Sequence, residues 1–216
     1  MTTTNQVPIK LPKIFRPFEC LQLIRLGKDN DGGYIVNKHD VDKTDLLISF
    51  GIGNDWSFEK SFSENNNCSI FRFDKTTKVP LDNNFFIENH KLISKNIDFN
   101  NSDETISFDD VISAANNNIF LKCDIEGDEY KFLEKIINCS CKFTSIVIEF
   151  HDVFIEENFN TITNFISKVG LNLVHLHANN CTTVRSGDSY LPYAIEMTFT
   201  SSNNIKYNPN KITTQS

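Results

Sequence analysis

The chain has 216 residues, and its formal net charge at pH 7 is −7. Hydrophobic residues make up 39% of it and 19 residues are Phe, which excludes a disordered chain and allows one domain with a sizeable core. No block of Lys and Arg offers the basic surface that nucleic acid requires. No apolar run approaches the ~20 residues that cross a bilayer. We therefore expect a globular protein whose partners are neither nucleic acid nor membrane.

The N-terminal residues and the cysteines indicate the cellular compartment in which the protein is expected. The first 30 residues contain no continuous apolar segment, so we expect no signal peptide and a cytoplasmic protein. The six cysteines include no Cys-x-x-Cys pair, which argues against a zinc ribbon, and we expect reduced thiols.

Strands and helices are expected to alternate from residue 44 onward. Upstream, two apolar runs within residues 20–36 flank a glycine turn and predict a hairpin. Whether its loop is only a turn or reaches over a ligand stays open. Five strands follow, over 45–50, 69–73, 91–97, 119–123 and 145–150. Four helices are expected, one capped by Asn54 or Asp55 and three over 108–115, 128–137 and 160–169.

Two further strands, over 172–177 and 193–200, have no helix between them and are expected to be antiparallel neighbours. The predicted fold class is α/β, with a Rossmann-like, mostly parallel sheet, a C-terminal antiparallel strand and helices on both faces. We expect an N-terminal extension over 1–43, a main domain over 44–200 and a polar tail over 201–216.

A glycine turn and a spaced acid predict a nucleoside site. The strand over 45–50 runs into Gly51-Ile-Gly53, which brings backbone N–H groups close to a ligand. Trp56 stands where the dinucleotide pattern G-x-G-x-x-G has its third glycine, so a pyrophosphate is disfavoured. Asp74 ends the next strand, 21 residues after Gly53, where an acid can accept hydrogen bonds from both ribose hydroxyls.

Titratable side chains follow three neighbouring strands of the expected sheet. The first strand provides Asp124 and Glu126 just after its end. The next provides Glu149, His151 and Asp152 at and after its end, and the third provides His175, His177 and Asn179. Open α/β sheets bind ligands at this edge, so we interpret the cluster as functional. Lys122 lies within an apolar strand and is expected to pair with Asp124 or Glu149.

Two of these segments resemble a known family. Lys122-Cys-Asp-Ile-Glu-Gly127, followed by Asp128-Glu129, resembles the K-x-D-x-E-G-x-E block of FkbM-type methyltransferases. SFGIGNDWSFE resembles the first motif of the same superfamily, in a branch that also carries an upstream N-D-G-G-Y segment. The resemblance implies a class I methyltransferase fold, S-adenosylmethionine as methyl donor, and a hydroxyl of a sugar or secondary metabolite as acceptor.

We therefore predict an S-adenosylmethionine-dependent O-methyltransferase that acts on a glycan or a sugar-containing metabolite. The residues expected to bind the cofactor are Gly51, Gly53, Asn54, Asp74 and Asp124. An NAD-linked oxidoreductase on a similar sheet and a non-catalytic ligand-binding module are the alternatives.

A sugar hydroxyl is a weak acid, so the reaction needs a base. We expect His151 in this role, oriented by Asp124 or Glu149, with His177 as the alternative base. Alternatively, a divalent cation bound by Asp124, Glu149 and His151 could lower the pKa of the acceptor hydroxyl. No short-range ligand motif in the sequence requires such a cation.

Overall fold

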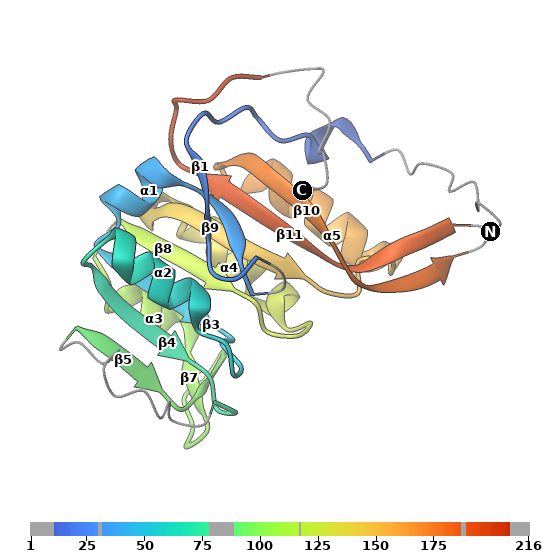
Figure 1. The fold of residues 1–216 in the computed structure, drawn as a ribbon. Coiled ribbons are helices and arrows are strands. Elements are labelled where there is room, and N and C mark those ends of the chain that lie inside the picture. Colours follow the sequence, from blue (N-terminus) through green and yellow to red (C-terminus); the bar gives the residue numbers. More distant parts are fainter. Residues whose placement is uncertain (1–10, 30–31, 78–88, 117, 187–188, 208–216) are drawn as a thin grey trace.

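The computed structural model describes residues 11–207, apart from 30–31, 78–88, 117 and 187–188 (Figure 1). Its main sheet has seven strands in the order β10-β11-β9-β8-β3-β4-β5. The strands are β3 Leu46–Phe50, β4 Ser69–Phe73, β5 His90–Ile93, β8 Ile119–Cys123, β9 Phe143–Phe150, β10 Asn172–Ser186 and β11 Ser189–Thr200.

Six of these strands run in the same direction, and β11 runs antiparallel to them between β9 and β10. This mostly parallel sheet with a reversed strand confirms the predicted fold class, a Rossmann-like α/β sheet with a C-terminal antiparallel strand. The antiparallel pairing expected for the last two strands is confirmed as well.

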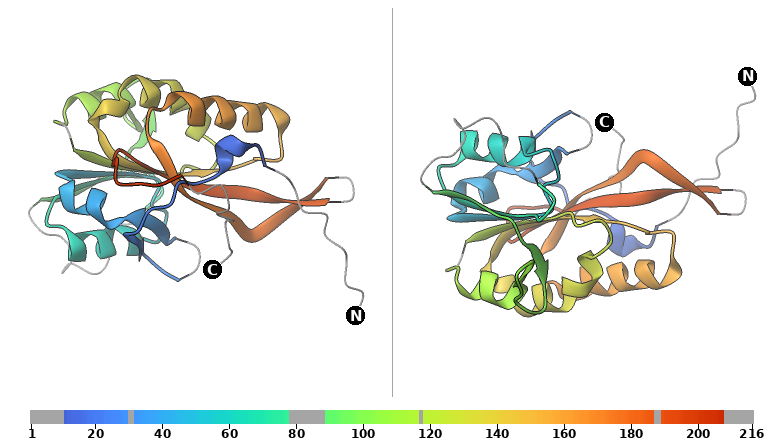
Figure 2. Two further views of the ribbon diagram at one scale, coloured as in Figure 1. Left: turned by 90° about the horizontal axis from the view of Figure 1, so that it is seen from above. Right: turned by 90° about the horizontal axis from the view of Figure 1, so that it is seen from below.

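Helices cover both faces of the sheet (Figure 2). One face carries α1 Lys38–Lys43 and α2 Ser57–Asn65, and the other carries α3 Phe108–Ser113, α4 Leu133–Asn138 and α5 Glu156–Lys168. The 3-10 turns are η1 Lys13–Phe15, η3 Glu129–Phe132 and η4 Ser140–Lys142. In the described part of the chain, every helix is too short or too polar to cross a membrane.

The central strands are buried on both faces, which explains their apolar sequences. Successive side chains of a strand point to opposite faces. In β8, for example, Phe120 packs with Phe58 and Phe62 of α2, while Leu121 packs into the core under α3 to α5. The same alternation places Lys122 on the α2 face.

The N-terminal hairpin is confirmed as β1 Leu23–Leu26 paired antiparallel with β2 Tyr34–Asn37. It packs on the α2 face, where Leu26, Tyr34 and Val36 are buried in one cluster with side chains of α2 and β3. Asn30 and Asp31 of its turn lie outside the described residues.

Several element boundaries differ from those expected. The strand expected over 91–97 is two strands, β5 and β6 Asn96–Asp98, and β6 pairs with β7 Thr105–Ser107 in a separate small sheet. The helix expected over 128–137 begins as η3. The last two strands are longer than expected, because pairing continues through most of the polar segment between them. The five cysteines whose side chains are described are free thiols; Cys181 is not among them.

Candidate functional site

The turn after β3 depends on glycine at residue 51. Gly51 has a φ of +71°, and a Cβ atom there would lie 1.6 Å from the carbonyl oxygen of Asp124. Any side chain would force the ends of β3 and β8 apart, which is why glycine is needed. Gly53 differs, because its φ is +51° but a Cβ atom there would meet no described heavy atom within 4 Å.

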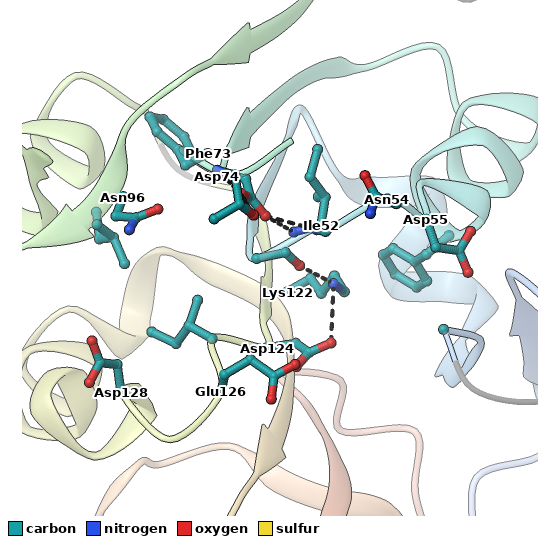
Figure 3. Close-up of a pocket in the computed structure, with 17 residues that line it drawn as sticks. Ile52, Asn54, Asp55, Phe73, Asp74, Asn96, Lys122, Asp124, Glu126 and Asp128 are labelled. Atoms are coloured by element: carbon teal, nitrogen blue, oxygen red, sulfur yellow. Dashed lines mark hydrogen bonds and ion pairs between the residues drawn. The ribbon is translucent and has the colours of Figure 1, made fainter. Parts of the chain in front are cut away.

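Asp74 stabilises the same turn (Figure 3). Its Oδ2 accepts the backbone N–H groups of Ile52 at 3.0 Å and Gly53 at 2.7 Å, and its Oδ1 accepts those of Thr76 at 2.6 Å and Thr77 at 3.0 Å. Burial would raise the pKa of Asp74, but the hydrogen bonds from Thr76, Gly53 and Ile52 hold it below its ordinary value. The ribose contact expected of Asp74 stays a prediction.

A pocket of about 430 Å³ lies at the carboxyl ends of β3, β4 and β8. Its volume is in the range of small-molecule sites. Because β3 stands between β4 and β8, this is the point at which the strand order reverses, where open α/β sheets bind their ligands. All five residues expected to bind a cofactor line it: Gly51, Gly53, Asn54, Asp74 and Asp124.

The loop between β1 and β2 borders this pocket. Gly32 is one of the lining residues, and a Cβ atom there would lie 2.4 Å from Oδ2 of Asp55. Nζ of Lys28 forms an ion pair with the same carboxylate at 3.0 Å. The N-cap residue of α2 is Trp56 rather than the expected Asn54 or Asp55, but Oδ1 of Asp55 accepts the backbone N–H of Ser57, the first residue of the helix, at 3.0 Å. The hairpin loop is therefore tied to the glycine turn.

Lys122 is a structural cation, and its expected pairing with Asp124 is confirmed. Its Nζ donates to the carbonyl of Gly51 at 2.6 Å and lies 3.6 Å from Oδ2 of Asp124 (Figure 3). Burial would lower the pKa of Lys122, but the negative charges of Asp124, Glu59 and Glu149 raise it. The charged ammonium thus links the glycine turn to the end of β8.

A second pocket, of about 240 Å³, adjoins the first, and Asp124 and Glu126 line both. Its other walls are formed by Glu149, His151, Asn179, Thr182, Tyr193 and Ala194. The structure therefore brings Asp124, Glu149 and His151 together, as the strand ends indicated.

Tyr34 of β2 lies behind two of these carboxylates. Its hydroxyl donates to Oδ2 of Asp124 at 2.8 Å and lies 3.3 Å from Oε2 of Glu149. Nδ2 of Asn179 donates to Oε1 of Glu149 at 2.9 Å. These contacts hold the acidic wall in place, and the sequence offered no sign of the part that Tyr34 plays, since it precedes Asp124 by 90 residues.

His151 is oriented by Glu129 rather than by Asp124 or Glu149. Its Nδ1 lies 2.9 Å from Oε1 of Glu129, and its Nε2 lies 3.6 Å from Oε2 of Glu126. Burial would lower the pKa of His151, but the hydrogen bond and charge of Glu129, with the charges of Glu149 and Asp124, raise it to about 9. The ring is therefore protonated near neutral pH, whereas the expected base needs a neutral ring.

Glu129 is the site residue that sequence reasoning missed. The helix expected over 128–137 would place it in a first turn, where acids are common, but the side chain is fully buried. Its Oε1 also accepts the backbone N–H groups of Ile125 at 3.1 Å and Gly127 at 3.2 Å. The last acid of the K-x-D-x-E-G-x-E block, which falls on Glu129, was the available signal.

His177, the alternative base, is not brought to this cluster. His177 of β10 stands opposite Glu196 of β11 in the strand register, and it lines neither pocket. Its ring stacks on His175 with the centroids 6.4 Å apart. Burial, with the positive charge of Arg25, lowers the pKa of His177.

No protein-family model matches this chain, and no curated protein sequence matches it. Three solved structures illustrate the folds that it is similar to. Methanococcus jannaschii fibrillarin, a pre-rRNA processing protein, has 12% identity and a TM-score of 0.48, over 89% of this chain and 85% of that one. The precorrin-6y C5,15-methyltransferase of Geobacter metallireducens has 14% identity and a TM-score of 0.45, over 76% of this chain and 84% of that one. M. jannaschii TYW2 in complex with AdoMet has 10% identity and a TM-score of 0.40, over 83% of this chain and 86% of that one. With TM-scores below 0.5, these likenesses support no conclusion about activity or ligand.

Proposed function

We propose that this chain is an S-adenosylmethionine-dependent O-methyltransferase that acts on a hydroxyl of a glycan or a sugar-containing metabolite. The observation that carries the proposal is the pocket of about 430 Å³ at the reversal point of the sheet, lined by the glycine turn. The reversed strand β11 and the missing third glycine argue against the alternative, an NAD-linked oxidoreductase.

In this proposal the cofactor lies along the glycine turn. Gly51, Gly53 and Asn54 border its amino-acid end, Asp74 binds the ribose, and Asp124 closes the pocket beside the acceptor. Both oxygens of Asp74 already accept backbone hydrogen bonds, so the ribose hydroxyls would share these acceptors or replace Thr76.

The acceptor is assigned to the second pocket, whose wall carries the carboxylates of Asp124, Glu126 and Glu149. Such a wall repels phosphate groups, which disfavours a nucleic-acid acceptor, as does the net charge of −7. Asn179, Thr182 and Tyr193 offer the neutral hydrogen-bonding groups that suit a polyhydroxyl ligand. The resemblance to FkbM-type methyltransferases also supports a sugar hydroxyl.

The methyl carbon passes from the sulfonium to the acceptor oxygen, and the acceptor loses a proton. The donor is already activated, so positioning the two reactants in adjoining pockets supplies much of the rate. We assign orientation of the acceptor and removal of its proton to the wall formed by Asp124, Glu149 and His151. The carboxylates of Asp124 and Glu149 can accept the proton, and the protonated ring of His151 can donate a hydrogen bond that orients the acceptor.

Calorimetry with S-adenosylhomocysteine and with NAD tests the cofactor. We expect the first to bind and the second not to. Asp74→Ala should weaken binding of S-adenosylhomocysteine by about 1.5–3 kcal/mol, the range for hydrogen bonds to a charged group. Asp103→Ala, an exposed acid between β6 and β7, is the matched control and should change nothing.

Methyl transfer from labelled S-adenosylmethionine to a panel of glycans tests the activity. A chain that binds S-adenosylhomocysteine but methylates no member of the panel would favour a non-catalytic module. Binding of NAD in preference to S-adenosylhomocysteine would overturn the proposal.

A further inference from the structure

Three side chains from different elements converge beside the second pocket, which two of them line. Asp124 follows β8, Glu129 opens η3 and His151 follows β9, and each offers one potential ligand atom within 4.8 Å of the other two. Glu129 and His151 are buried and Asp124 is half-buried. Two carboxylates and one imidazole form a mixed oxygen and nitrogen donor set of the kind that holds divalent metal ions.

Glu129 provides an independent sign of a missing ligand. The side chain is 0% exposed, and while its Oε1 accepts three hydrogen bonds, its Oε2 is buried without a hydrogen-bond partner among the described residues. A buried carboxylate oxygen that has lost water and gained no partner is unfavourable, and buried charges are ordinarily paired or coordinated to a metal.

The charges around the cluster lead to the same conclusion. Glu149 lies beside it, buried, and the carboxylate of Glu126 is 3.6 Å from Nε2 of His151. Lys122, the cation next to Asp124, donates at 2.6 Å to the carbonyl of Gly51. Carboxylates thus outnumber the cations close to them, and a further positive charge would relieve their mutual repulsion.

We propose that Asp124, Glu129 and His151 bind a divalent cation. Without the ion, the proton on Nδ1 of His151 lies between this atom and Oε1 of Glu129, which are 2.9 Å apart. The ion would replace that proton, which is released to solvent, because a metal-bound imidazole is neutral. The same separation suits neighbouring ligands of one ion, since two ligands at about 2.1 Å and at right angles lie about 3 Å apart. The ligand set that we infer differs from the one expected from sequence, because Glu129 replaces Glu149.

Three protein ligands leave coordination positions open to a ligand in the second pocket, which Asp124 and His151 both line. A hydroxyl bound to the ion would be more acidic and easier to deprotonate. This role rests on the proposed function, whereas the cation site itself does not.

Binding of Mn²⁺ to the full chain tests the site without any cofactor. Electron paramagnetic resonance and calorimetry should show one bound Mn²⁺ per chain, which Mg²⁺ displaces. Glu129→Gln and Asp124→Asn should each weaken Mn²⁺ binding at least ~10-fold, the lower end of what even outer-shell partners contribute. Glu134→Gln, the same change at an exposed position of α4, should bind as the wild type does.

A thermal scan of each variant shows whether it is folded, and Mn²⁺ should raise the midpoint of the wild type and of Glu134→Gln but not of Glu129→Gln. The inference is overturned if the wild type binds no stoichiometric Mn²⁺, or if all variants bind it equally. Calorimetry with S-adenosylhomocysteine in metal-free buffer is scored separately, so failure of the cation site is distinguishable from failure of the proposed function.

Discussion

Replacing Gly51 by Ala would test how the glycine turn is built. The new methyl group would lie 1.6 Å from the carbonyl oxygen of Asp124, and the residue would keep a φ of +71°, which costs an L-residue about 1–2 kcal/mol. Relief of the clash requires the backbone at Asp124 to withdraw.

That withdrawal loosens two hydrogen bonds. One runs from the N–H of Asp124 to the carbonyl of Phe50 at 3.1 Å, and the other from Nζ of Lys122 to the carbonyl of Gly51 at 2.6 Å. A neutral bond contributes about 1 kcal/mol and a charged one about 1.5–3 kcal/mol. With the backbone strain, we expect Gly51→Ala to lower the free energy of unfolding by about 3–6 kcal/mol.

Gly53→Ala is the matched control, because the same substitution two residues later meets only the backbone strain. Its φ is +51° and no described heavy atom would contact the methyl group, so we expect a loss of about 1–2 kcal/mol. Urea unfolding followed by circular dichroism measures both variants. Equal losses in the two, or wild-type stability in Gly51→Ala, would refute this account of the turn.

Three further substitutions test the site and the fold. His151→Ala should lower kcat by ~10²-fold or more and leave the affinity for S-adenosylhomocysteine nearly unchanged, because the loss falls on the transition state; a wild-type kcat would remove His151 from the mechanism. Tyr34→Phe deletes a hydroxyl that contacts Asp124 at 2.8 Å, so urea unfolding should show a loss of about 1.5–3 kcal/mol, and no loss would mean that the contact stabilises nothing. Asp40 of α1 is 1% exposed, and burial, only partly offset by hydrogen bonds from Thr200 and Asn37, raises its pKa to about 6. The fold therefore favours its protonated form, and stability falls as the pH rises from about 4 through about 6. Asp40→Asn should remove this fall, stabilising the protein by roughly 1–3 kcal/mol at pH 8 and by little at pH 4; an equal gain at both pH values would show that ionisation is not the cause.

The sheet was predictable because its strands carry strong local patterns. The apolar run of β9 and the strand-to-glycine transition after β3 each indicate their element without help from the rest of the chain. The edge at which the acids gather followed from the parallel order alone. All five residues expected at the cofactor accordingly line one pocket.

The rest depends on contacts between residues far apart in the sequence. Glu129 resembles an ordinary acid in a first helical turn, and only the packing of η3 against β9 shows that it is buried beside His151. Tyr34 reads as a hydrophobic strand residue, and its hydroxyl meets Glu149 across 115 positions. The expectation of a neutral His151 ring started from an unperturbed pKa, which takes no account of the buried carboxylates that raise the pKa of His151 to about 9.

Asp124 and Glu126 separate the two pockets and belong to both of them. A ligand on one side of this partition therefore alters the field felt by a ligand on the other. Thermodynamic linkage makes such an effect mutual: whatever factor one ligand contributes to the affinity of the second, the second contributes to the first. In the proposed reaction the sulfonium becomes a neutral thioether when its methyl group leaves, so completion of the transfer would itself remove a positive charge from beside the partition. A ligand titration of one pocket therefore measures an affinity that holds only for the occupancy that the other pocket has in that experiment.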